Sequence, residues 1–304
     1  MAKRRNKQRN QTWQFTVKES TTLLPFLLTV MTNRSRNSVK SMLKRGQVSI
    51  DDQVETKHNH PLHSGQQLSV VKNKAFKRES DLIGLTVLYE DVDLLVVNKA
   101  AGLLTIANQR EKKRTAHYQL MRYVRKENPR NRVYIVHRLD RETSGVIVFA
   151  KNERTKQQLQ KNWRTNVKER EYLALVEGNF EKEHGVVTSW LKETKTHRMY
   201  SSPNQNDGQF AKTHYKRIQS NEKFSLIQVH LATGRKNQIR VHMQDLGHPV
   251  VGDKKYGAKT DAIRRLGLHA QTLAFTHPTT GEFLTFTCPA PKAFWSKSKE
   301  QIDI

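Results

Sequence analysis

The chain has 304 residues, enough for one large domain with a small one or for two domains of middle size. It carries 54 Lys and Arg against 28 Asp and Glu, a formal charge of +26. Self-repulsion of this excess opposes folding, so a polyanionic partner is the simplest reason for it. No apolar run approaches the roughly 20 residues that span a bilayer, which favours nucleic acid over a membrane as that partner.

The chain has one cysteine, Cys288, which excludes an internal disulfide and a zinc site built on thiolates. This usage agrees with a reducing, cytoplasmic location. Cys288 lies at the end of an apolar run followed by proline, where we expect a packed thiol rather than a reactive nucleophile.

The first residues form a basic arm. Residues 1–12 contain five Lys and Arg, no acidic residue and almost no apolar side chain, so we predict that they are disordered. Such an arm either contacts phosphates or serves as a solubilising tail.

Residues 13–72 are predicted to form a small α/β domain. The leucines between 23 and 28 follow a helical period, and residues 38–45 give a second helix that ends at Gly46. Residues 47–50 and 67–71 are typical of short strands. This segment resembles the small RNA-binding domain of ribosomal protein S-four, through residues 34–48 and 62–66. Its predicted RNA surface consists of Arg34, Arg36, Lys40, Lys44 and Arg45; the alternative is an ordinary solvated helix face.

We expect a linker at residues 73–83, a catalytic domain at 84–292 and a C-terminal tail at 293–304. The catalytic segment mixes strand patterns with helical ones at 152–166 and 236–246. The strands are expected at 94–97, 133–136, 145–150, 172–176, 224–231 and 283–286. The fold class is therefore α+β, with a mixed sheet in the catalytic domain and a small α/β domain before it.

The most informative segment is residues 137–145, which read His-Arg-Leu-Asp-Arg-Glu-Thr-Ser-Gly between two apolar strands. A polar loop held between buried strands is a good mount for a reactive group. Asp140 lies between Arg138 and Arg141, and neighbouring cations favour an ionised carboxylate. Such a group serves as a nucleophile or base, or ties two arginines into a structural network; local chemistry leaves both readings open.

The segment resembles the signature of the RluA-type pseudouridine synthases. Further segments match that family in order across 84–292: 89–99, 168–178, 231–242, 247–257 and 268–270. The resemblance implies that Asp140 is the catalytic aspartate and attacks the target uridine, either at the anomeric carbon or at ring carbon 6. It implies that Tyr172 stacks on the uracil and that Arg235 pairs with the aspartate. It further implies that Arg138 fills the gap left by the flipped nucleotide and that Ile239 packs against the base.

The family usually has His at the position of Asn237 and Pro at that of Ala100. These departures bear on the positioning of Arg235, so a non-catalytic RNA-binding or ribosome-assembly protein remains the alternative. No nucleotide-binding or metal-binding pattern is present, and we expect no cofactor and no metal. The resemblance implies large-subunit ribosomal RNA as substrate, with transfer RNA as the alternative, and a monomer.

Overall fold

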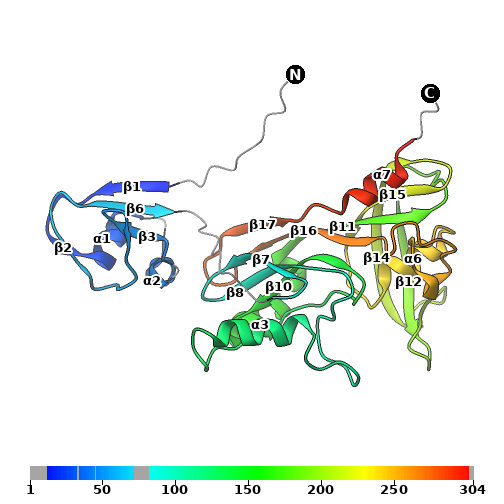
Figure 1. The fold of residues 1–304 in the computed structure, drawn as a ribbon, viewed down its shortest axis with the longest axis horizontal. Coiled ribbons are helices and arrows are strands. Elements are labelled where there is room, and N and C mark those ends of the chain that lie inside the picture. The colour runs from blue at the N-terminus through cyan, green and yellow to red at the C-terminus, as the bar shows by residue number, and fades with distance from the viewer. Residues whose placement is uncertain (1–11, 33, 45, 72–81, 301–304) are drawn as a thin grey trace.

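The computed structural model describes residues 12–32, 34–44, 46–71 and 82–300 (Figure 1). The predicted basic arm, apart from Thr12, and most of the predicted linker therefore lie outside the described residues. The same holds for Arg45 and for the side chain of Lys44.

The N-terminal unit, blue in Figure 1, has a core of its own. Its four-stranded sheet has the order β1-β6-β3-β4, and a two-stranded sheet pairs β2 with β5. Helices α1 and α2 bury Leu23, Leu27, Val39 and Leu43 against these sheets. The bounds are β1 Thr12–Thr16, β2 Thr21–Thr22, α1 Leu23–Val30, α2 Arg36–Lys44, β3 Val48–Ile50, β4 Gln53–Val54, β5 Pro61–Leu62 and β6 Gln67–Val71.

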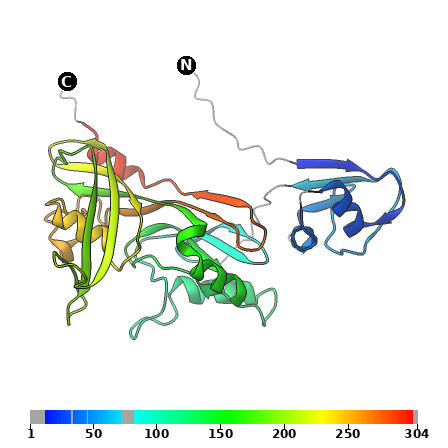
Figure 2. The same ribbon diagram turned by 180° about the vertical axis from the view of Figure 1, so that it is seen from behind.

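The rest of the described chain is built on an 11-stranded sheet (Figures 1 and 2). Its main path runs β13-β12-β14-β15-β11-β16-β10-β8-β7, with β17 beside β16 and β9 beside β10. The strands are β7 Leu85–Glu90, β8 Leu94–Lys99, β9 Tyr134–Ile135, β10 Ser144–Ala150, β11 Val167–Glu177, β12 His184–Glu193, β13 Met199–Ser202, β14 Gln209–Ser220, β15 Phe224–Leu231, β16 Leu268–Thr276 and β17 Phe283–Thr287. The helices are α3 Ala116–Arg125, α4 Glu153–Lys161, α5 Trp163–Asn166, α6 Gln238–Asp245, a short 3-10 helix η1 Lys254–Tyr256 and α7 Lys292–Ser298.

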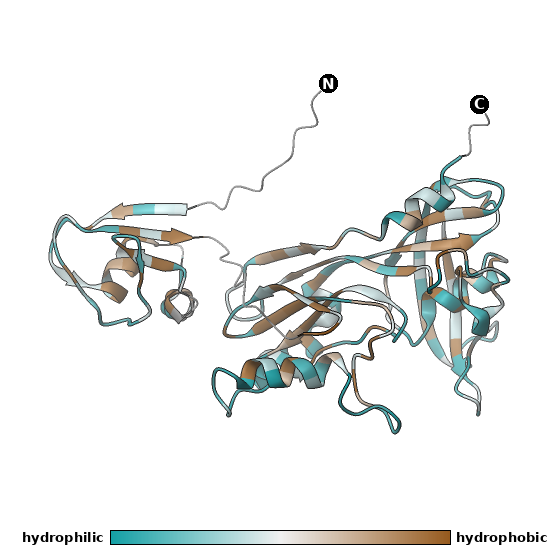
Figure 3. Cartoon of the chain, viewed as in Figure 1, coloured by the Kyte–Doolittle hydropathy of each residue, from teal (hydrophilic) through white to brown (hydrophobic). Residues whose placement is uncertain are grey.

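Strands β8 and β10 are buried on both faces, which explains their continuous apolar runs (Figure 3). Successive side chains of a strand point to opposite faces. Ile147 and Phe149 therefore pack with Leu120 of α3, while Val146 and Val148 pack with Leu159 of α4. Burial of each such side chain contributes about 1.5 to 3 kcal/mol, so these two layers form a firm base for the loop that precedes β10.

That loop enters the sheet at Gly145. Strands β10 and β16 pair in parallel through Ser144 and Gly145, whereas the other strand pairs of this sheet are antiparallel. Gly145 has a φ of +117°, and a Cβ there would lie 2.0 Å from the carbonyl oxygen of Ala270. Glycine is thus required where residues 136–143 pass into the sheet.

All six strands and both helices predicted in the catalytic segment are present, with the strand at 224–231 unchanged and the others shifted at their ends. The helix expected at 152–166 is divided at Asn162 into α4 and α5, and Asn152 caps α4 by accepting from the backbone N–H of Thr155. The prediction of a buried thiol at Cys288 is confirmed. The predicted C-terminal tail begins with a helix, because α7 starts at Lys292 and buries Phe294 completely. Among the described residues, no helix is long and apolar enough to cross a membrane.

Candidate active site

A cavity of about 330 Å³ opens beside the loop before β10. Its walls come from that loop, from α5, β11 and the end of β15, and from the first turn of α6. Four of the residues predicted from the resemblance to act on the substrate nucleotide lie in the walls together with Asp140: Arg138, Tyr172, Arg235 and Ile239. The structure thus brings together side chains that are up to 101 positions apart in the sequence, from Arg138 to Ile239.

Asp140 is partly exposed, with 27% of its side chain accessible, and it faces Arg240. Nη1 of Arg240 lies 3.6 Å from Oδ2 of Asp140. The same guanidinium donates from Nε and Nη2 to the two carboxylate oxygens of buried Asp253, at 2.6 and 2.8 Å. A bidentate pair of hydrogen bonds fixes both the position and the orientation of the guanidinium. Asp253 therefore determines how Nη1 of Arg240 is directed toward Asp140.

Arg240 keeps its charge despite burial. Burial lowers its pKa, but the hydrogen bonds and charge of Asp253, together with Asp140, outweigh this effect and raise the pKa above the usual value. Its guanidinium also lies 4.8 Å from the centre of the Tyr256 ring. Arg240 is therefore a permanent cation in a fixed place.

Asn237 joins this network from the position before α6. Its side-chain Oδ1 accepts from Nη1 of Arg240 at 3.1 Å, and its side-chain Nδ2 donates to the hydroxyl of Tyr256 at 2.9 Å. Its backbone has a φ of +55°, a left-handed conformation that Asn adopts more readily than most residues. Asn237 therefore links the start of α6 to the guanidinium that faces Asp140.

The expected pairing of Asp140 with Arg235 is not found, and Arg240 takes that place. Nε of Arg235 donates to the carbonyl oxygen of Phe210 at 3.0 Å, and the Arg235 backbone N–H is held by Gln238. Arg235 still lines the cavity, so its side chain remains part of the wall. The physical reason is that the first turn of α6 directs Arg240 inward, while Arg235 precedes the helix and is drawn to strand β14.

Tyr172 stands on β11 and packs against the cores on both sides of the cavity. Burial raises the pKa of its hydroxyl to about 12; Arg170 works against this shift and Asp140 adds to it. The phenol is therefore neutral at physiological pH. Arg170, also in the wall, donates to the carbonyl oxygen of Leu231 at 2.7 Å, which keeps its cation on the wall of the cavity.

The remaining wall is aromatic and aliphatic. His137 stacks on Trp163 with ring centres 4.8 Å apart, and its Nε2 accepts from the backbone N–H of Val148. Burial, with a smaller effect of Arg170, lowers the pKa of His137 to about 3, so this imidazole is neutral. Ile239 is 4% exposed and belongs to the core beneath the cavity, whereas Arg138 is exposed at the cavity wall.

Lys99 anchors the backbone of the Asp140 loop through its buried ammonium group. It is fully buried, and its ammonium donates to the carbonyl oxygens of Ala100, Leu103 and Arg141 at 2.8 to 3.1 Å. Burial lowers its pKa to about 8, against the opposing effect of Glu142 and Asp140. The hydroxyl of Thr105 adds a bond to the carbonyl oxygen of Leu139 at 2.7 Å. The backbone is therefore hydrogen-bonded on both sides of Asp140, at Leu139 and at Arg141.

One cluster among the described residues has the composition of a metal site: Glu169, Glu171 and His230. Both carboxylate oxygens of Glu171 already accept from side-chain amides, those of Gln228 and Gln271, each at 2.7 Å. These bonds give Glu171 a structural role between neighbouring strands.

The predicted RNA surface of the N-terminal unit is only partly described. Arg36 is exposed and Lys40 half-buried on α2. Arg34 lies 3.7 Å from Glu282 of the large unit, which draws this cation toward the catalytic part of the chain. The binding role of these residues stays a prediction.

Taken together, the cavity offers a carboxylate, a fixed cation beside it, a neutral phenol and apolar walls. Trp163, Ile239 and Leu268, with the Tyr172 ring, give the lining an apolar part that suits contact with a flat aromatic ring, and 27% of the Asp140 side chain is exposed. The fold and this site define a class of enzyme that acts on a base or nucleoside inserted from outside.

The comparisons with known proteins identify the class more closely. The RNA pseudouridylate synthase family matches residues 93–245, which include Asp140, Tyr172 and Arg240. An uncharacterized RNA pseudouridine synthase of Mycoplasma genitalium is 34% identical, over 92% of this chain and 92% of the relative. Ribosomal large subunit pseudouridine synthase D of Nitrosomonas europaea is 32% identical, over 84% and 77%. The solved structure of human RNA pseudouridylate synthase domain containing 1 has a TM-score of 0.57 at 26% identity, over 70% of this chain and 86% of that one.

The chain belongs to the RNA pseudouridylate synthase family, and it is an RNA-modifying isomerase of that family. The RluA-type resemblance drawn from the sequence and the α+β fold with a mixed sheet are both confirmed.

Proposed function

We propose that the protein isomerises specific uridines of large-subunit ribosomal RNA to pseudouridine, with Asp140 as the nucleophile. The observation that carries this proposal is the partly exposed carboxylate of Asp140 beside Arg240 in a cavity that also contains Tyr172. Ribosomal RNA is favoured over transfer RNA because relatives named for the ribosomal large subunit match most of the chain. This substrate also implies work in the cytoplasm.

The reaction needs no cofactor. The carboxylate of Asp140 attacks either the anomeric carbon or ring carbon 6 of the target uridine, and the bond between the sugar and ring nitrogen 1 breaks. The uracil turns and rejoins the sugar through ring carbon 5, the proton on that carbon passes to solvent while ring nitrogen 1 takes up a proton, and the carboxylate is released. Substrate and product have the same atoms, so no oxidant, reductant or donor enters.

The other wall residues suit this sequence of steps. The neutral ring of Tyr172 stacks on the uracil, with Ile239 as an apolar surface in the same cavity. Arg138, exposed at the wall, is placed to occupy the gap in the RNA once the uridine is extruded. Extrusion costs a few kcal/mol, and an inserted side chain offsets part of that cost.

Release of tritium from uracil carbon 5 tests the proposal directly. Unmodified ribosomal and transfer RNA transcripts are treated with the wild-type protein and with Asp140→Asn, which keeps the shape of the side chain. We expect release from ribosomal RNA by the wild type and a loss of at least about a thousandfold in the variant, as for removal of a nucleophile. Equal release by both proteins would refute the role of Asp140, and release from transfer RNA alone would refute the substrate.

A further inference from the structure

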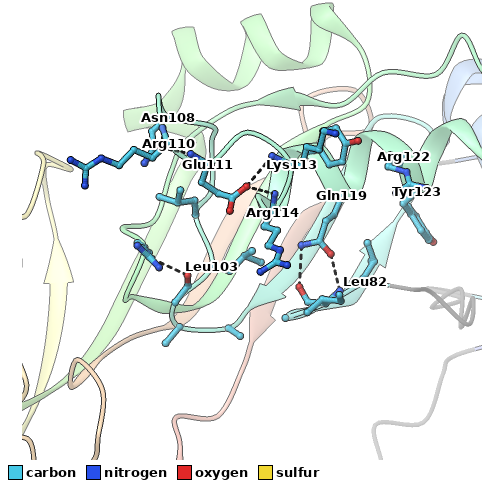
Figure 4. A pocket seen from close by; sticks show the side chains of 18 of the residues that line it. Leu82, Leu103, Asn108, Arg110, Glu111, Lys113, Arg114, Gln119, Arg122 and Tyr123 are labelled. Carbon is cyan, nitrogen blue, oxygen red and sulfur yellow. Dashed lines mark hydrogen bonds between the residues drawn. The ribbon is translucent and has the colours of Figure 1, made fainter.

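A second, larger hollow lies on the other side of the Asp140 loop (Figure 4). It measures about 1160 Å³ and is bounded by residues 100–114, by one face of α3 and by residues 82–84. We refer to it as the basic groove. It is roughly three and a half times as large as the catalytic cavity, so it has room for several nucleotides if the cavity holds one.

The charges of the basic groove are almost all of one sign. Its lining contains one acid, Glu111, and six cations: Arg110, Lys113, Arg114, Arg122, Lys126 and Arg141. Figure 4 shows these charges spread along its length, with Arg110 at one end, Arg114 in the middle and Arg122 at the other end. Within the described part of the chain, no carboxylate lies in ion-pair range of Arg110, Arg114 or Arg122.

Glu111 offsets only part of this positive charge, and its carboxylate also orders the loop. Its carboxylate accepts from the backbone N–H groups of Arg114 and Lys113 at 2.9 and 3.1 Å. Asn108 holds the preceding turn through the N–H groups of Arg110 and Glu111. These bonds order a loop whose cationic side chains remain exposed.

The basic groove also has surfaces suited to sugars and bases. Tyr118 is 36% exposed on α3, one turn before Arg122, and Arg114 lies just before the start of that helix; Ile83 is 81% exposed at the far edge. The backbone of Ile83 is fixed by a two-way bond with the side-chain amide of Gln119. Cations alternating with an aromatic ring are the features with which proteins bind single-stranded RNA.

The basic groove reaches the catalytic residue. Arg141 lines it and directly follows Asp140, which lines the cavity. The carbonyl oxygen of Arg141 accepts from the backbone N–H of Gly102, and its Nε donates to the carbonyl oxygen of Gly102. The segment between the cavity and the groove is therefore fixed by these two bonds. A strand whose uridine lies in the cavity therefore continues naturally into the groove.

We propose that the basic groove binds the backbone of the RNA strand that flanks the target uridine. This rests on the proposed function, but the binding experiment below does not require catalysis.

The experiment compares two triple charge reversals in the Asp140→Asn background, with ribosomal RNA transcripts as the probe. The groove variant is Arg110→Glu, Lys113→Glu and Arg114→Glu. The matched control is Lys182→Glu, Lys216→Glu and Lys297→Glu, at exposed positions outside both linings. Both variants change the net charge equally, so only the place of the change differs. Circular dichroism and thermal unfolding verify that each is folded.

We expect the groove variant to bind at least roughly tenfold more weakly than the control at low salt, because three phosphate contacts are lost. The slope of log affinity against log salt should fall by about 2 relative to the control, at roughly 0.7 per contact. Hydroxyl-radical footprinting should show protection lost on one side of the target uridine only. Equal affinities and equal salt slopes for the two variants would overturn the proposal. The groove would then be a candidate binding site for a partner of another class, such as an acidic protein segment.

A five-nucleotide RNA centred on the target uridine separates the two proposals. In the otherwise wild-type protein, the groove reversals should lower tritium release from this short RNA much less than from the full transcripts, because the short RNA has fewer flanking phosphates for the groove to bind. If the wild type releases no tritium from any RNA, the proposed function fails, while the affinity comparison still decides the role of the groove.

Discussion

The catalytic cavity and the basic groove lie on two sides of one loop and use charge in opposite ways. In the cavity the cations around Asp140 and Tyr172 are held by partners: Arg240 by Asp253 and Asn237, and Arg170 by the carbonyl oxygen of Leu231. Arg138 is the exposed exception at the cavity wall. In the groove, Arg110, Arg114 and Arg122 have no carboxylate of the described residues within ion-pair range. A charge that orients a reacting group must be held in place by bonded partners. A charge that binds a polyanion must instead remain free to contact its phosphates.

The difference predicts opposite salt behaviour. Charges in a partly buried network are screened little by ions, and exposed ones are screened strongly, with a Debye length of about 10 Å at 0.1 M salt. Substitutions in the cavity should therefore act at every salt concentration, and those in the groove mainly at low salt.

Arg240→Gln should have the largest effect among the cavity variants that leave Asp140 in place. It removes the cation between two carboxylates, Asp140 and Asp253, and leaves Asp253 buried without its partner. Breaking such a pair costs about 3 to 5 kcal/mol of unfolding free energy. Because Asp140 loses its orienting partner, we also expect kcat to fall by roughly a hundredfold. Urea unfolding and single-turnover tritium release measure the two effects.

Arg240→Lys provides the control, because it keeps the charge but cannot form the two-pronged bond to Asp253. Its kcat should lie between those of the wild type and Arg240→Gln, at both low and high salt. A loss of activity that disappears at high salt would place Arg240 with the exposed cations of the groove and break the comparison.

Much of the catalytic domain was predictable because its strands depend on local pattern. The apolar runs of β8 and β10 indicated strands, and the resemblance of residues 137–145 to a family signature pointed to Asp140 as the candidate nucleophile. Helix α3 and strands β12, β14 and β16 were not predicted as elements. The pairing of these three strands is decided by neighbours that are distant in the sequence.

The partner of Asp140 was not predictable from spacing. Arg235 and Arg240 are five residues apart around the start of α6, and either could approach Asp140 if the turn began differently. The left-handed backbone of Asn237 sets that beginning, and the carboxylate of Asp253 then selects Arg240. The basic groove was missed for a similar reason, because its cations come from a loop and a helix whose proximity appears only in three dimensions.

His137 gives a prediction with an intermediate effect. Its pKa is lowered to about 3 in the folded protein, chiefly by burial, against an ordinary value of 6.5. The unfolded chain therefore binds a proton more readily between pH 6.5 and 3, and the folded state loses stability as pH falls through this window. Between pH 7 and 5, the wild type should lose roughly 1 to 2 kcal/mol more than His137→Gln, measured by urea unfolding.

The groove supplies the contrast, because Lys and Arg side chains carry the same charge at pH 5 and 7. The ratio of RNA affinities between the groove variant and its control should therefore stay constant over this range. Equal acid sensitivity of the wild type and His137→Gln would show that the imidazole accepts a proton in the folded protein.

Asn237 gives the smallest effect and the sharpest test of how the cavity positions its cation. Asn237→Gly retains the left-handed backbone but removes the bonds to Arg240 and Tyr256, whereas Asn237→Ala also strains the backbone. Loss of one hydrogen bond to a charged group is worth about 1.5 kcal/mol, so kcat should fall roughly tenfold in both variants. Unfolding should be easier in Asn237→Ala by about a further 1 kcal/mol. A different result would be a kcat that falls with stability, so that Asn237→Ala is less active than Asn237→Gly. In that case the Asn237 side chain would only stabilise the turn before α6, and Asp253 alone would orient Arg240.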